Sequence, residues 1–106
     1  MPNLRNMETL HDNSALGRTV QSLGYASIQD FAREQARSLI QQNMAYYQAR
    51  IDLFEQKYGL DFQQFVEQFD SLGKYSIIEK EDDSMLWETA IDVVSAYRAD
   101  LEAIAA

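Results

Sequence analysis

Apolar and polar residues alternate along most of this chain with the period of an α-helix. In the longest run, apolar side chains recur every three or four residues, a spacing that places them on one helical face: Ala36, Ile40, Met44, Tyr47, Ile51, Phe54 and Tyr58. No glycine or proline interrupts residues 27–58. Ser27 is a good N-cap residue, and Asp30 follows it at the spacing of a capping box. The pattern therefore predicts one long helix over 27–58.

A shorter helix is predicted before the long one. Asn13 and Ser14 are good N-cap residues, and Gly24 stands where a left-handed residue commonly ends a helix. The apolar residues between these signals share one face: Leu16, Val20 and Leu23. These features predict a helix over 14–23. Residues 1–12 show no helical period, and we expect them to form a flexible arm or a short strand.

Three independent signals agree on the start of a third helix. Asp61 is a good N-cap residue, and Gln64 completes the spacing of a capping box. Leu60 and Phe65 have the spacing of a hydrophobic staple. A helix is therefore predicted over 61–71.

The last predicted helix spans residues 84–104. Its apolar residues have the most regular spacing in the chain: Trp87, Ala90, Val94, Tyr97, Leu101 and Ile104. The charged segment 79–84 before it is expected to be a solvated acidic loop, and the apolar residues Ile77 and Ile78 are expected to be covered. The fold class predicted is all-α, with four helices, one of them long and central, in a single domain over 1–106.

The long helix presents more apolar surface than the other three helices are expected to cover. At a rise of 1.5 Å per residue it would be about 48 Å long, whereas a compact chain of this length has a radius of gyration near 13 Å. We therefore expect a homo-oligomeric bundle, most simply a two-fold dimer. Its interface would contain these residues: Ala36, Ile40, Met44, Tyr47, Ile51 and Phe54. The alternative is a helix that bends near 41–43 and folds back within a monomer, and the spacing leaves parallel and antiparallel pairing open.

Composition narrows the classes of function. The chain has no cysteine, which excludes disulfides and thiolate chemistry and favours the reducing cytoplasm. No apolar run approaches the roughly 18 residues of a membrane span. His11 is the only histidine, and the acidic segment 79–83 lacks the ligand spacing of an EF-hand. We expect a cytoplasmic protein that is not an enzyme and holds no metal or cofactor.

Charge divides the chain into two unlike halves. Residues 1–58 contain six acids and six bases, so their charges balance. Residues 59–106 contain eleven acids and three bases, which gives the whole net charge of −8. Such a surface can keep a protein in solution, or it can dock a basic protein. The residues predicted to bind a partner are Glu79, Glu81, Asp82, Asp83, Trp87 and Tyr97, although Trp87 and Tyr97 also fit core positions.

Two segments resemble known families. Residues 53–65 (LFEQKYGLDFQQF), an acidic spacer and residues 84–88 (SMLWE) resemble a group of small prokaryotic antitoxins of toxin–antitoxin pairs. Residues 23–34 (LGYASIQDFARE) are similar to the helix junction of ribbon-helix-helix repressors. In that repressor family an N-terminal strand reads the major groove of DNA. Here the corresponding segment contains a single basic residue, Arg5, so we expect nucleic-acid binding to be weak or absent.

The resemblance implies an antitoxin-like protein. By this analogy the N-terminal half would form a homodimer, and the acidic C-terminal half would cover a basic toxin. The alternative is a self-assembling helical protein whose apolar faces are covered by its own copies and which has no toxin partner.

Overall fold

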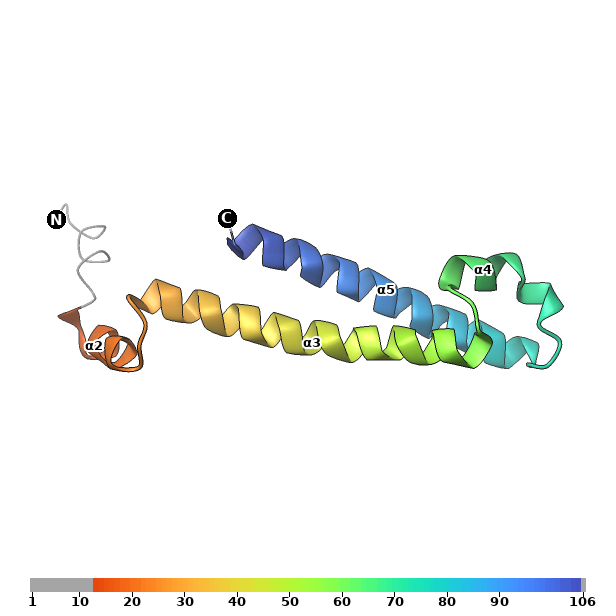
Figure 1. Ribbon diagram of the computed structural model, residues 1–106, viewed down its shortest axis with the longest axis horizontal. Coiled ribbons are helices and arrows are strands. Elements are labelled where there is room, and N and C mark those ends of the chain that lie inside the picture. The colour runs from red at the N-terminus through yellow and green to blue at the C-terminus, as the bar shows by residue number, and fades with distance from the viewer. Residues whose placement is uncertain (1–12, 106) are drawn as a thin grey trace. The chain divides into compact units, whose positions relative to one another are not determined.

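A computed structural model describes residues 13–105 of the chain (Figure 1). Its helices are α2 (Ala15–Ser22), α3 (Ile28–Tyr58), α4 (Phe62–Glu67), the 3-10 turn η2 (Phe69–Ser71) and α5 (Ile77–Ala105). No strand occurs within 13–105. Over these described residues, the predicted all-α fold with four helices and a long central one is therefore confirmed. The arm or strand expected over 1–12 lies outside the described residues.

The chain divides into two compact units, and the division falls inside α3. The first unit ends at Leu39 and the second spans Ile40–Ala106. Helix α3 therefore contributes its first turns to one unit and its remaining turns to the other.

The first unit contains α2 and the start of α3. The Ser14 side chain accepts a hydrogen bond from the Gly17 N–H at 2.9 Å, which caps α2 as predicted. After α2, Gly24 has a φ of +101°, a conformation that only glycine adopts without strain. Ser27 then accepts from the Asp30 N–H at 3.0 Å and begins α3. Both predicted helix starts are thus confirmed in this unit.

Helix α3 is continuous over its 31 residues. No break occurs at 41–43, so the alternative of a helix folded back at that point is wrong. Gly59, with a φ of +68°, follows the last residue and turns the chain toward α4.

The predicted capping box of the third helix is present. The Asp61 side chain accepts from the Gln64 N–H at 2.8 Å, and the Gln64 side chain accepts from the Asp61 N–H at 3.0 Å. The helix itself is shorter than predicted, because α4 ends at Glu67 and the chain tightens into η2.

Helix α5 begins seven residues earlier than predicted. Ser76 caps it: its side chain accepts from the Glu79 N–H at 3.1 Å, and its carbonyl accepts from the Lys80 N–H at 3.0 Å. Acidic residues in the first turns are favoured by the positive end of the helix dipole. The expected acidic loop over 79–84 is therefore wrong, since this segment is helical. Ile77 and Ile78 are also not covered, and their exposed fractions are 64% and 72%.

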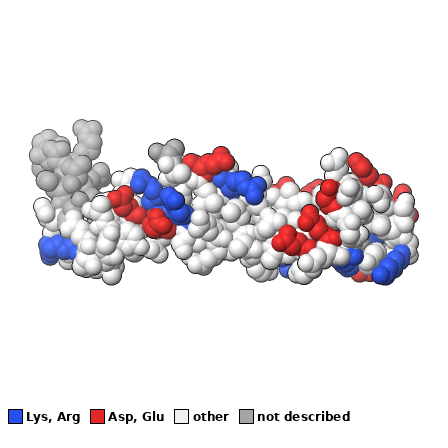
Figure 2. All heavy atoms as spheres, viewed as in Figure 1, with Lys and Arg blue, Asp and Glu red and all other residues white. Residues whose placement is uncertain are grey.

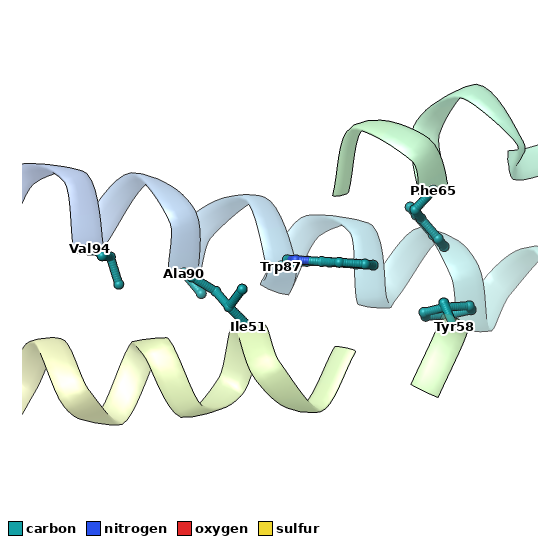
Figure 3. Close-up of a cluster of buried hydrophobic side chains, with 6 residues drawn as sticks. All are labelled: Ile51, Tyr58, Phe65, Trp87, Ala90 and Val94. Atoms are coloured by element: carbon teal, nitrogen blue, oxygen red, sulfur yellow. The ribbon is translucent and has the colours of Figure 1, made fainter. Parts of the chain in front are cut away.

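In the second unit, α5 runs antiparallel to α3. Lys57 near the end of α3 contacts Asp83 near the start of α5, and Asn43 contacts Tyr97 farther along α5. Figure 3 shows Ile51 of α3 directed toward Ala90 of α5, and Val94 directed toward α3. The apolar stripes predicted on the two long helices therefore pack on each other within one chain.

The centre of this core is aromatic. Trp87 and Phe65 are fully buried, and their ring centroids lie 5.2 Å apart. Phe54 and Tyr58 of α3 stack on Trp87 at 5.5 and 6.0 Å. Helix α4 thus closes the core through Phe65, at the end where α3 and α5 are joined by their connection.

Candidate protein-binding surface

Two of the four acidic residues predicted to bind a partner are occupied within the chain. Glu79 and Asp83 both contact the Lys57 Nζ, each at 2.6 Å. The Tyr58 hydroxyl donates to the same oxygen of Asp83, also at 2.6 Å. Tyr75 donates to the carbonyl of Lys57 at 2.9 Å. These contacts fasten the end of α3 to the start of α5, so Glu79 and Asp83 have a structural role.

The environment of this cluster raises two pKa values. Hydrogen bonds to Asp83 and then Glu79 raise the pKa of Lys57 well above its ordinary value, because both carboxylates favour the ammonium form. Burial, followed by the hydrogen bond to Asp83, raises the pKa of the Tyr58 hydroxyl, because both disfavour the phenolate. Lys57 therefore stays charged and Tyr58 neutral at ordinary pH.

The other two predicted acids, Glu81 and Asp82, are exposed on α5. Neither has an ion-pair or hydrogen-bond partner among the described residues. Their neighbours on the helix are apolar and exposed: Ile78, Met85 (71% exposed) and Leu86. Asp82, Met85 and Leu86 line a shallow, open hollow. These five residues, Ile78, Glu81, Asp82, Met85 and Leu86, are called the α5 outer face below.

The two aromatic residues predicted to anchor a partner are not on this face. Trp87 is fully buried in the core, so core packing, the other role that fits its position, is the one the structure shows. Tyr97 is half-buried, and its hydroxyl accepts from the Asn43 side chain at 3.2 Å. Trp87 is therefore not presented on the surface as an anchor, whereas Tyr97 is partly exposed.

Helix α5 covers most of the six residues of α3 that were predicted to form an oligomer interface. Ile51 is buried in the core, and Met44, Tyr47 and Phe54 pack against it. Ile40 and Ala36 are half-buried. The sequence predicts a second chain on this stripe, because the long helix presents more apolar surface than the other three helices are expected to cover. The structure corrects this reasoning for Ile51 and its three neighbours, since α5 covers them.

Sequence reasoning missed the apolar part of the α5 outer face. Ile78 and Met85 are seven residues apart, which places them on one side of a helix, with Glu81 and Asp82 between them. This spacing could be seen in the sequence, but a seven-residue spacing indicates a shared face only in a helix. Because residues 79–84 were predicted to be a loop, the spacing was not interpreted as a face.

Charge on the surface follows the division seen in the sequence. Figure 2 shows acidic side chains over the part of the molecule formed by α4 and α5. Two lysines near these acids are engaged within the chain: Lys57 of α3 is held by Glu79 and Asp83, and Lys80 is buried with its Nζ donating to the Phe69 carbonyl at 2.6 Å. The exposed cations of residues 59–105 are Lys74 and Arg98, which are fewer than the exposed acids.

Comparison with known proteins adds no relative. No family model, no curated protein and no solved structure matches the chain. Within residues 13–105, no group of three or more His, Asp or Glu side chains has the arrangement needed to hold a metal ion. None of the helices in this range is both long enough and apolar enough to cross a membrane.

Proposed function

We propose that this chain is a protein-binding module, an antitoxin-like partner that docks a basic toxin through its acidic C-terminal half. The observation that carries the proposal is the α5 outer face, where unpaired carboxylates and exposed apolar side chains lie together. The resemblance of residues 53–65 and 84–88 to antitoxins supports the same function.

The composition of the α5 outer face suits a protein partner. Burying Ile78, Met85 and Leu86 would contribute roughly 25 cal/mol per Å² of apolar surface removed from water. Glu81 and Asp82 would provide the opposite potential that steers a basic protein to this site and fixes its orientation. A solubilising surface would need the carboxylates but not the exposed isoleucine and methionine on either side of them.

If a basic protein is encoded beside this chain, co-expression of the two tests the proposal. We expect the two proteins to copurify and this chain to suppress the toxicity of its neighbour. Recovery of self-associated chain alone, with no neighbouring product whose toxicity it suppresses, would show that the antitoxin-like function is wrong.

A pair of charge-reversal variants tests the location of the site. Glu81→Lys with Asp82→Lys is expected to weaken the complex at least about tenfold, and to reduce its dependence on salt. The matched control is Asp100→Lys with Glu102→Lys, which makes the same change of charge elsewhere on α5. Equal losses in the two variants would show that general charge, and not the α5 outer face, determines binding.

The alternative function, self-assembly without a toxin, has one observation in its favour. Tyr46 and Leu53 of α3 are seven residues apart on one side of the helix, and both are exposed. A row of this kind is suited to pairing with a second copy. A homo-oligomer that forms while no basic partner is found would favour this alternative.

A further inference from the structure

The α5 outer face continues along the helix as a row of exposed residues on the side away from the core. Ile78 and Met85 precede the buried residues Trp87 and Val94 by nine positions each, and Ala96 follows Trp87 by nine. Nine residues make two and a half helical turns, so these three residues point away from the core. The residues between them at helical spacing are exposed on the same side. The complete set, called the outer row below, is Ile78, Asp82, Met85, Thr89, Asp92 and Ala96.

The outer row has the spacing and the side-chain sizes that suit another helix. Its residues stand alternately four and three positions apart, as do side chains that pack between two helices. Its first half carries the large side chains of Ile78 and Met85, and its second half carries the smaller ones of Thr89 and Ala96. Large and small side chains on facing helices interlock, so a partner with the opposite order of sizes can approach closely. Since no strand within 13–105 offers an edge to an extended segment, the partner element is a helix.

Charge argues against a second copy of this chain as the occupant of the outer row. An antiparallel copy fits by size, because its Ala96 comes opposite Ile78, but the same pairing sets Asp82 opposite the second copy's Asp92. A parallel copy sets each carboxylate opposite its own equivalent. Asp82 and Asp92 are exposed, and neither has a hydrogen-bond or ion-pair partner among residues 13–105. Like charges that face each other are destabilising, whereas lysine or arginine would pair with both carboxylates.

We propose that the outer row docks a basic amphipathic helix of the partner, with leucine-sized side chains over Thr89 and Ala96 and with lysine or arginine beside Asp82 and Asp92. This inference rests on the proposed function, which supplies a basic partner. It names the element that the partner contributes. It also extends the contact from the α5 outer face to Ala96, more than two turns farther along the helix.

A basic amphipathic peptide tests whether the outer row accepts such a helix. The probe is a blocked, fluorescently labelled peptide with three repeats of Leu-Lys-Ala-Ala-Leu-Lys-Lys, whose residues favour a helix with leucine on one side. The control peptide has the same residues in an order that distributes leucine around the helix, so its charge is unchanged. We expect fluorescence anisotropy to show saturable binding of the probe that weakens as salt is raised. The control peptide is expected to bind at least about tenfold more weakly, and equal binding of the two peptides would overturn the proposal.

Removal of the large side chains tests the apolar contact. Ile78→Ser with Met85→Ser is expected to weaken binding of the probe at least about tenfold, because less apolar surface is buried. The matched control is Tyr46→Ser with Leu53→Ser, which removes from α3 two exposed apolar side chains that are also seven positions apart. It should leave binding unchanged, and equal losses in the two variants would contradict the proposal. A fall from an oligomeric to a monomeric mass in the α5 variant alone would show that a second copy occupies the row, which would also contradict it.

Enlargement of the small end tests the close approach of a helix. Ala96→Met adds exposed apolar surface but holds a docked helix away from α5, so it is expected to weaken binding of the probe several-fold. The matched control is Ala49→Met, which makes the same change at an exposed alanine of α3 and should leave binding unchanged. Unchanged or stronger binding in Ala96→Met would show that the peptide is attracted by apolar surface in general, and the proposal would be wrong.

The same variants separate failure of helix docking from failure of the proposed function. If a neighbouring basic protein binds the chain and loses affinity in Glu81→Lys with Asp82→Lys but not in Ala96→Met, helix docking along the outer row is wrong and the antitoxin-like function stands. If no basic protein binds, the proposed function fails, and the peptide titration still decides whether the outer row accepts a basic helix.

Discussion

At the scale of single residues, the chain depends on a small polar cluster as well as on apolar packing. Lys57, Tyr58 and Tyr75 converge on Asp83 and on the main chain at the end of α3. Because Asp83 accepts from both Lys57 and Tyr58, its loss would leave a buried hydroxyl without an acceptor. The cluster therefore joins α3 to α5 through residues that are 25 and 26 positions apart in the sequence.

The raised pKa values of Lys57 and Tyr58 predict alkaline sensitivity. For a group whose pKa is raised by folding, the stabilisation is complete below its ordinary pKa, here 10.5 and 10.0, and is lost as the pH rises through the folded-state value. These two groups are expected to contribute no pH dependence between about pH 7 and 9, and a decline in the free energy of unfolding above about pH 10. Denaturant titrations at a series of pH values, from about pH 7 to above pH 10, measure this free energy of unfolding. The variant Tyr58→Phe should show a smaller decline, and an unchanged decline would contradict the assignment.

The capping box at Asp61 predicts a loss of stability when it is removed. Asp61→Ala deletes the acceptor for the Gln64 N–H and is expected to lower the free energy of unfolding by about 0.5 to 2 kcal/mol. Chemical denaturation gives the value. Asp70→Ala is the matched control, because Asp70 is exposed and caps no helix; it should change stability by less than about 0.5 kcal/mol. Similar losses in both would argue against the cap.

At the scale of elements, the sequence was enough to predict which segments are helical and where most of the helices begin. Ser14, Ser27 and Asp61 cap the helices they were predicted to cap, because capping is a local interaction within four residues. The start of α5 was not predicted. Ser76 was overlooked as a cap, and the charges of 79–83 were interpreted as loop although glutamate and lysine are good helix formers.

The candidate site was less predictable than the fold, for a physical reason. Helical spacing shows which residues share a face of one helix. It does not show whether another helix of the same chain or a second chain packs on that face. The stripe around Ile51 was predicted to bind a second chain, and α5 of the same chain covers it. An open cleft lined by Ile51, Phe62 and Trp87 is formed by three helices, α3, α4 and α5, so no local sequence pattern could indicate it.

The helical state of the acidic segment can be tested with proline. Asp82→Pro would remove a main-chain hydrogen bond inside α5 and is expected to cost about 3 kcal/mol or more. Asp82→Ala, the control for loss of the carboxylate, should stay within about 0.5 kcal/mol of the parent. Thermal or denaturant unfolding compares them. Tolerance of proline at this position would mean that the segment is a loop.

At the scale of the whole molecule, oligomerisation is a prediction that now rests on a different surface. Light scattering is expected to give at least twice the chain mass of 12.2 kDa. Leu53→Glu changes an exposed residue of α3 and should return the protein to a folded monomer. Ile51→Glu, two residues earlier, should instead unfold it, because an unpaired charge in the core costs several kcal/mol. A monomeric mass for the parent protein at micromolar concentration would contradict the prediction.

The burial of Lys80 has a practical consequence for chemical labelling. The chain contains three lysines: one is buried, and Lys57 is clamped between carboxylates, which leaves Lys74 as the exposed side-chain amine of the second unit. An amine-reactive dye applied to the native protein should therefore modify Lys74 in preference to the other two. A fluorophore attached to Lys74 would lie in the connection between α4 and α5. It would report on binding near the start of α5 and leave the acidic side chains unmodified.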